Sequence, residues 1–182
     1  YIQTWNGTSW SGQQTLSLPN NFLAETDVEF TAIAADPNSD RIAIGVVTGG
    51  SESQVVFAVW DGASWGDMLM ATNSSYAANS MSAAVGFESQ SGQLLATYSE
   101  FATTPRYQTW TSGGGWSGEQ SIPDIGAYAQ VMSLSADPET DALMLAVQDH
   151  QSDLNYILWD GTGWGAVNEV TDNTGETGTR PF

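Results

Sequence analysis

The chain of 182 residues carries 21 acidic residues against three arginines, one histidine and no lysine, which gives a formal net charge of −18 at pH 7. A surface this acidic repels phosphate backbones and anionic lipids, so we expect neither nucleic-acid binding nor membrane-surface binding. Because the chain has no cysteine and no apolar run of about 18 residues, we also expect no thiol chemistry and no membrane insertion.

A pair of tryptophans recurs four times along the chain, at intervals of about 50 residues. The pairs are Trp5 and Trp10, Trp60 and Trp65, Trp110 and Trp116, and Trp159 and Trp164. A second segment recurs between the pairs: AADPNSDRIAIGV at 34–46, GFESQSGQLLATY at 86–98 and SADPETDALMLAV at 135–147. These correlated copies predict an internal structural repeat.

In chain order, each unit reads as four short strands separated by turn residues. Residues 1–27 are expected to supply only the third and fourth strands of a first unit. The complete units are 28–76, with strands at 30–35, 42–47, 54–60 and 65–71; 77–126, with strands at 82–87, 94–98, 106–110 and 116–122; and 127–175, with strands at 131–136, 143–147, 154–159 and 164–170. Residues 176–182 are expected to begin a further unit. No segment shows helical periodicity, so we expect no helix.

Repeated four-stranded units of this length predict an all-β, β-propeller-type array of antiparallel blades. The chain would form one repeat domain of about three and a half blades. The first strand of each unit is rich in small residues, such as Ala32, Ala83 and Ser133, as expected where blades converge on the axis. A stacked β-sandwich array is the competing fold, but it gives no reason for these small residues.

Each tryptophan pair flanks a polar turn, most clearly in VWDGASWG at 59–66 and LWDGTGWG at 158–165. A two-residue loop would place the rings diagonally and a four-residue loop would place them opposite each other, but both registers put them on one face. We expect these rings mainly to pack one blade against the next. The alternative is that exposed rings stack on sugars, with Trp10, Trp65, Trp116 and Trp164 as the candidate ligand-binding residues.

The turns DPNSD and DPETD each place two carboxylates four residues apart, and these are weak calcium candidates. The four residues are Asp36, Asp40, Asp137 and Asp141. A type I turn with proline at its second position explains the same pattern, and we favour it. We therefore expect no metal and no cofactor.

Catalytic signals are sparse. His150 is the one histidine and lies in the polar segment VQDHQSD, and the sequence contains neither a G-x-S-x-G motif nor a glycine-rich phosphate loop. We therefore expect a protein that is not an enzyme.

The W[ND]GxxW, ADPxxD and FExxSG patterns together resemble the tryptophan-rich, propeller-like repeats of large secreted or surface proteins of bacteria. More distantly, the chain resembles the six- and seven-bladed fucose-binding lectins. Binding sites in that family include an arginine and a glutamate, but no arginine recurs here, so no site residue is carried over.

From this we expect an extracellular or cell-surface structural module without catalytic activity. Its expected partner is another copy of itself, as in a filament, or the continuation of a longer chain. A glycan-binding lectin is the alternative.

Overall fold

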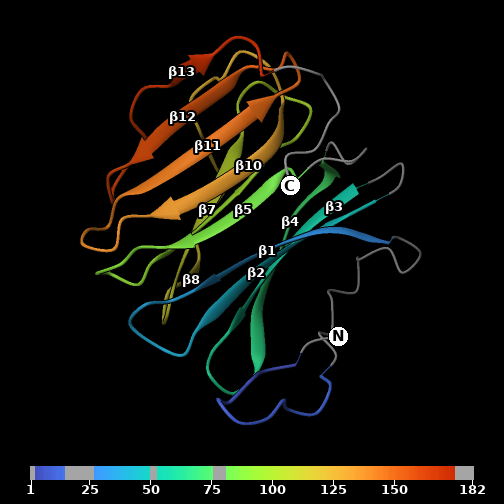
Figure 1. Ribbon diagram of the computed structural model, residues 1–182, viewed down its shortest axis with the longest axis vertical. Helices are drawn as coiled ribbons and strands as arrows, with labels where there is room; N and C mark the ends of the chain where they lie inside the picture. Colours follow the sequence, from blue (N-terminus) through green and yellow to red (C-terminus); the bar gives the residue numbers. More distant parts are fainter. Residues whose placement is uncertain (1–2, 15–26, 50–52, 76–80, 175–182) are drawn as a thin grey trace.

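The computed structural model describes residues 3–14, 27–49, 53–75 and 81–174, and these residues form three antiparallel sheets (Figure 1). The first blade consists of β1 (Val28–Ala35), β2 (Ile42–Thr48), β3 (Ser53–Trp60) and β4 (Trp65–Ser75). The second contains β5 (Ala83–Phe87), β6 (Leu94–Tyr98), β7 (Arg106–Thr111) and β8 (Gly115–Trp116), with β9 (Gln120–Ser121) also paired to β7. The third contains β10 (Ala129–Ala136), β11 (Leu143–Asp149), β12 (Leu154–Trp159) and β13 (Asn168–Thr171).

The expected first three strands of every complete unit are confirmed, within about two residues at their ends. The described residues contain no helix, as expected, and therefore none long and apolar enough to cross a bilayer. The first hairpin is present as a bridge between Trp5 and Trp10. The strand expected to begin at 176–182 lies outside the described residues.

The expected continuous fourth strand is wrong for the second and third blades, where pairing breaks just after the second tryptophan. Ser117 explains the break in the second blade, because its hydroxyl accepts the Thr109 N–H at 2.9 Å in place of a backbone carbonyl. In the first blade the strand continues, with Asp67 at a positive φ of 44°. The segment after the second tryptophan is therefore irregular, which leaves room for loops at the outer edge of each blade.

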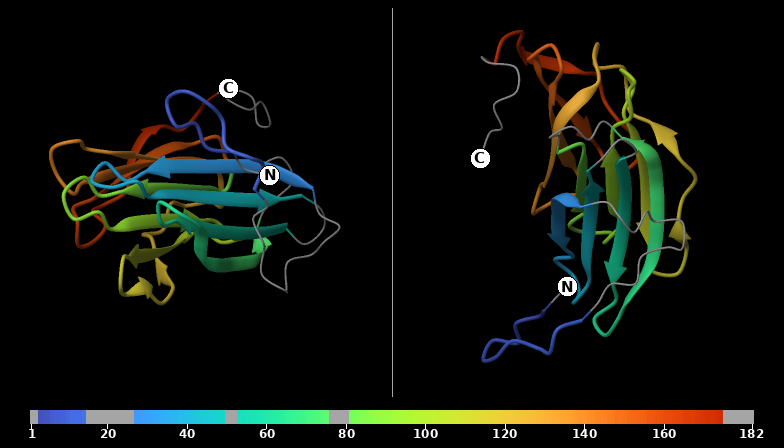
Figure 2. Two further views of the ribbon diagram at one scale, coloured as in Figure 1. Left: turned by 90° about the horizontal axis from the view of Figure 1, so that it is seen from below. Right: turned by 90° about the vertical axis from the view of Figure 1, so that its right-hand side faces the viewer.

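The blades lie side by side, with their first strands β1, β5 and β10 next to one another (Figure 1). β5 contacts β1 on one side and β10 on the other, so the second blade is held between the other two. The N-terminal residues 3–14 and the third blade lie at opposite ends of the molecule (Figures 1 and 2).

Two hydrophobic cores fill the interfaces between blades. We call the contact of the first and second blades the first interface, and that of the second and third the second interface. Side chains alternate along β6, so that Leu94, Ala96 and Tyr98 enter the first interface, whereas Leu95 enters the second. Small first-strand residues allow this close approach, because a Cβ on Gly86 would lie 2.6 Å from Leu143 Cδ2. The prediction of small residues where blades converge is confirmed at this position.

Candidate functional site

The two tryptophans of each pair face one another directly across a hairpin. Trp60 pairs with Trp65, Trp110 pairs with Trp116, and isolated bridges join the remaining two pairs. The directly opposite register follows from the four-residue loop, or from five residues in the second blade.

The loop sequence Asp-Gly or Asn-Gly fixes this register through local hydrogen bonds. Asp61 Oδ1 accepts the N–H groups of Ser64 at 2.7 Å and Ala63 at 2.8 Å, and these bonds lower the pKa of the Asp61 carboxyl. Gly62 follows with φ of +101°, which favours glycine. Asn6 and Asp160 make the same pair of bonds in their loops. The side-chain oxygens of the repeated loop therefore bond within the hairpin and hold its shape, and they do not form a ligand site.

The indoles of the second and third blades reach across to the preceding blade. Trp110 Nε1 donates to Asp67 Oδ2 at 3.1 Å, and Trp116 Nε1 donates to the Asp67 carbonyl at 2.6 Å. At the second interface, Trp159 Nε1 donates to the buried Glu88 carboxylate at 2.6 Å. The Tyr107 ring lies 5.5 Å from the Trp159 ring. These indoles therefore join blades together.

The structure does not bring the four candidate sugar-stacking tryptophans to one place. Trp10 is 64% exposed, whereas Trp65, Trp116 and Trp164 are half-buried, each in a different blade. The Nε1 atoms of Trp65 and Trp164 are buried without a hydrogen-bond partner among the described residues. Of the four, only Trp10 presents most of its ring to solvent.

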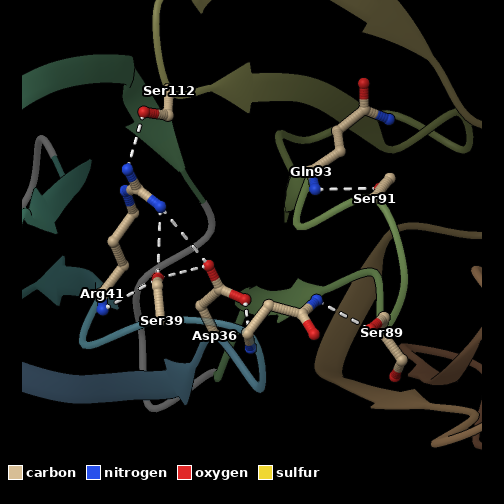
Figure 3. A network of polar contacts seen from close by, with 8 residues as sticks. Asp36, Ser39, Arg41, Ser89, Ser91, Gln93 and Ser112 are labelled. Atoms are coloured by element: carbon tan, nitrogen blue, oxygen red, sulfur yellow. Dashed lines mark hydrogen bonds and ion pairs between the residues drawn. The ribbon is translucent and has the colours of Figure 1, made fainter.

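The carboxylates of the two aspartate-proline turns are engaged by protein donors. Asp36 accepts from the Asn38 N–H at 2.9 Å and the Ser39 hydroxyl at 2.6 Å, with the Arg41 guanidinium 3.7 Å away (Figure 3). Asp137 accepts equivalent bonds within its own turn.

Asp141 instead accepts the N–H groups of Gln90 at 2.7 Å and Ser91 at 2.9 Å, which belong to the second blade. The Cβ of Asp40 lies beside Gly62, in the first-blade hairpin loop. Within the described ranges, no group of three or more acidic or histidine side chains has an arrangement that could hold a metal ion. The carboxylates of these turns therefore bond to donors of their own turn, as Asp36 and Asp137 do, or to the neighbouring blade, as Asp141 does.

A polar cluster that the sequence did not reveal lies at the edge of the first interface. Arg106, at the start of β7, lies between two carboxylates: its Nε is 3.8 Å from Glu119 Oε1 and 4.0 Å from Glu100 Oε2. Its Nη1 also donates to the Ser121 hydroxyl. Thr72 of the first blade donates its hydroxyl to Glu100 Oε1 at 2.8 Å, so both blades contribute.

The cluster is anchored from beneath by Tyr98, whose ring is fully buried and whose hydroxyl donates to Glu119 Oε2 at 2.5 Å. Burial, together with the bond to Glu119, raises the pKa of the Tyr98 hydroxyl above its ordinary value. Above this anchor, the Arg106 and Glu100 side chains are each 30% exposed and Glu119 is 44% exposed. The three side chains are thus held in place and each is partly accessible to a ligand, although the Arg106 Nε atom itself is buried.

This cluster occurs once in the described blades. The residues at the matching places of the third blade are Val147 for Tyr98, Asn155 for Arg106 and Val167 for Glu119, all read from the aligned tryptophan pairs. A residue type that is absent from the matching place of another blade is not needed to form the four-stranded blade. An alignment of the units with one another would have singled out Arg106 as the one charged residue in the third strands.

A pocket lies along the first strands, where β1, β5 and β10 meet, with a cavity volume of about 290 Å³. Its lining includes Ile33, Val85, Leu134 and Pro138, with Ser89 as a polar member. The lining holds no charged side chain, so this hollow offers few partners to a polyhydroxylated ligand.

No protein-family model matches the chain, and no curated protein sequence matches it. Solved structures do match. They include a mutant of the Aleuria aurantia lectin in complex with alpha-methyl-L-fucoside, at 16% identity and a TM-score of 0.58, covering 93% of this chain and 52% of that one. The lectin BP39L from Burkholderia pseudomallei matches at 16% identity and a TM-score of 0.58, covering 90% and 46% of the two chains.

A further Aleuria aurantia lectin structure is described as a six-bladed β-propeller with a novel fucose recognition mode, and matches at 17% identity with a TM-score of 0.57. At these identities the likeness establishes the fold, so the chain has a β-propeller-type fold, as the repeats predicted. The chain spans about half the length of each of these structures. The resemblance to large bacterial surface repeats stays a prediction.

Proposed function

We propose that the chain is a glycan-binding lectin module that binds sugar hydroxyls at the Arg106 cluster, and that it has no catalytic role. One observation carries the proposal: an arginine flanked by two carboxylates is accessible to solvent where two blades meet. This favours the lectin alternative over a purely structural module.

The cluster has the donors and acceptors that a sugar needs. A guanidinium presents several N–H donors in a fixed plane, and a carboxylate accepts from two neighbouring hydroxyls. Thr72 fixes Glu100, and Tyr98 fixes Glu119, so less side-chain freedom is lost when a ligand binds. A fixed set of one positive and two negative groups suits the neighbouring hydroxyls of a sugar better than it suits a ligand that carries a single charge.

Two further observations support a neutral glycan. The net charge of −18 disfavours anionic sugars, because the whole surface repels them. Several structures with the same fold are lectins described with fucosides, so a deoxyhexose is the first ligand to test. A lectin of this kind would act outside the cell or on its surface, which agrees with the localisation expected from the sequence.

The proposal is tested by a glycan array followed by calorimetric titration of the strongest neutral ligand. Arg106→Lys keeps the positive charge but loses the planar pair of donors, so we expect at least a tenfold weaker Kd, which is about 1.4 kcal/mol. Arg41→Lys is the matched control, because Arg41 contacts Asp36, Ser39 and Ser112 in another part of the first interface.

A Kd that is unchanged by Arg106→Lys but lost on Trp10→Ala would move the site to the exposed hairpin. No binding to any neutral glycan by the wild-type chain would overturn the function itself.

A further inference from the structure

We propose that Phe101, Tyr128 and His150 form a second sugar-binding site, which we call the aromatic platform, where the second and third blades meet. Its ligand is a neutral pyranoside of the galacto configuration, in which adjacent C–H groups lie on one face of the ring. The platform is separate from the Arg106 cluster, which lies at the edge of the first interface. Both sites bind glycans, so the platform rests on the proposed function.

The three rings come from two blades and contact one another in series. Phe101 lies in the loop after β6, whereas Tyr128 directly precedes β10 and His150 directly follows β11. The Tyr128 ring stacks on the His150 ring, with the ring centroids 4.4 Å apart and an interplanar angle of 19°. The Tyr128 and Phe101 ring centroids are 5.9 Å apart, with the two planes at 60°. Rings from the second and third blades thus form one aromatic surface.

The platform is open to solvent beside a blade that has neighbours on both sides. Phe101 is 65% exposed, His150 is exposed and Tyr128 is half-buried. In the described part of the second blade, Phe101 is the one large apolar side chain that is exposed. Because β5 of this blade contacts both β1 and β10, the exposure of Phe101 does not result from a missing neighbour on either side. Packing between blades therefore does not account for an aromatic residue at this place.

The four-stranded blade does not require these rings. Phe101 and His150 lie at the same distance from the start of the second strand in their blades, and Gly49 lies at this place in the first blade. The His150 N–H donates to the Tyr128 carbonyl at 3.1 Å, and the Gly49 N–H donates to the Asp27 carbonyl at 2.8 Å. A glycine and an aspartate thus make the same backbone bond in the first blade. The aromatic side chains are additional to what the fold needs.

Hydrogen bonds hold the platform in place before a ligand binds. Gln130 Nε2 lies 3.3 Å from His150 Nδ1, so it orients the imidazole ring. The loop that carries Phe101 is fixed on both sides, because the Ser99 N–H and the Thr103 carbonyl each make a backbone bond of 2.9 Å to a residue outside the loop. Less conformational freedom is therefore lost when a ligand binds.

The chemistry of the platform suits a neutral sugar. The face of an aromatic ring carries partial negative charge and attracts C–H groups, so it packs well on the C–H face of a pyranose. The Tyr128 hydroxyl, the His150 imidazole and the Gln130 amide supply donors and acceptors for the sugar hydroxyls. The platform contains no lysine or arginine, and the net charge of −18 repels anions, so an anionic ligand is disfavoured.

The size of the platform favours a sugar over a protein partner. One aromatic side chain buries roughly 150–250 Å² when it is fully covered, and the rings of the platform are only partly exposed. They therefore offer less than the roughly 800 Å² per partner that a stable protein interface buries. Two separate sites on one chain also raise the affinity for a branched or clustered glycan, because the second contact forms within the same complex.

The test is a nuclear magnetic resonance titration of the 182-residue chain with methyl β-galactoside at a fixed pH. His150 is the one histidine, so its imidazole C–H signals report on the platform directly. We expect these signals to move saturably as the sugar is added. Phe101→Ala removes a ring and should weaken the Kd about tenfold, whereas Phe101→Tyr keeps a ring and should bind as the wild type does. Because Phe101 is exposed, circular dichroism should show that both variants fold.

Two control variants separate the platform from other sites. Trp10→Ala should leave the His150 titration unchanged, because Trp10 is 64% exposed but belongs to the first hairpin. Arg106→Lys should also leave it unchanged, because Arg106 serves the other site.

His150 signals that do not move would overturn the platform, even where the Arg106 signal moves. Movement that is retained in full in Phe101→Ala, or lost in Arg106→Lys, would also overturn it, because the signals would then report binding elsewhere. Moving His150 signals beside an unmoved Arg106 signal would support the platform and overturn only the site proposed at Arg106.

Discussion

Glu88 provides a quantitative test of how the second and third blades are joined. Its carboxylate is 2% exposed, and its Oε1 accepts from Trp159 Nε1 at 2.6 Å and from Gln93 Nε2 at 3.0 Å, while Oε2 accepts from the Ser91 hydroxyl. In Glu88→Ala the Gln93 and Ser91 groups can turn toward water, because neither is buried. The Trp159 N–H cannot, because its side chain is 3% exposed.

The cost therefore comes mainly from the Trp159 N–H, a buried donor that loses its acceptor. Leaving such a donor unsatisfied costs about 1–3 kcal/mol, so we expect Glu88→Ala to lower the free energy of unfolding by about this amount. Urea unfolding followed by tryptophan fluorescence measures this change. Glu88→Gln keeps an oxygen for Trp159 and should lose less.

Asp137→Ala is the matched control, because Asp137 holds the same turn position in the third blade but is exposed and bonds within its own turn. Its loss should be less than half that of Glu88→Ala. If the two alanine variants lose equal stability, or if Glu88→Gln loses as much as Glu88→Ala, the buried bond to Trp159 does not join the blades.

Two further substitutions test the packing and the buried charge. Gly86→Ala should lower the free energy of unfolding in urea by about 1–3 kcal/mol, because its Cβ would lie 2.6 Å from Leu143 Cδ2. Gly66→Ala is the control, because no atom lies within 4 Å of its Cβ. Equal losses in the two variants would contradict the close approach at Gly86. Asp149 is fully buried, and burial raises the pKa of its carboxyl, so the folded state binds a proton more readily than the unfolded state and loses stability as the pH rises above 3.8. Asp149→Asn should therefore unfold at higher urea than the wild type at pH 7, and this advantage should shrink as the pH falls toward 3.8 and be absent below it. An advantage that is constant with pH, or absent at pH 7, would refute the assignment.

The fold could be predicted because its determinants are local and repeated. In WDGASW, the residues that close the loop and fix both tryptophans are contiguous, since Asp61 bonds to Ala63 and Ser64. The alternating apolar pattern of the strands is also local. Four tryptophan pairs at similar spacing are too regular to arise by chance, so they indicate a repeat. The broken fourth strand was missed because one Ser117 hydroxyl replaces a ladder bond, and period-two patterning does not record such a replacement.

The candidate site could not be predicted, because its members meet only after the blades pack. Thr72 comes from the first blade, whereas Glu100, Arg106 and Glu119 come from three separate places in the second. A site that is repeated in every blade requires an arginine that recurs with the repeat. Arg106 does not recur, so the repeat pattern does not mark it as a site residue.

The most direct test of glycan binding at the Arg106 cluster is a nuclear magnetic resonance titration that observes the arginine Nε–H signals. The chain has three arginines, so few signals appear, and Arg106→Lys identifies the relevant one. On adding a neutral monosaccharide, the Arg106 Nε–H signal should move saturably while that of Arg41 stays fixed. A titration in which the sugar binds but the Arg106 signal does not move would contradict the account.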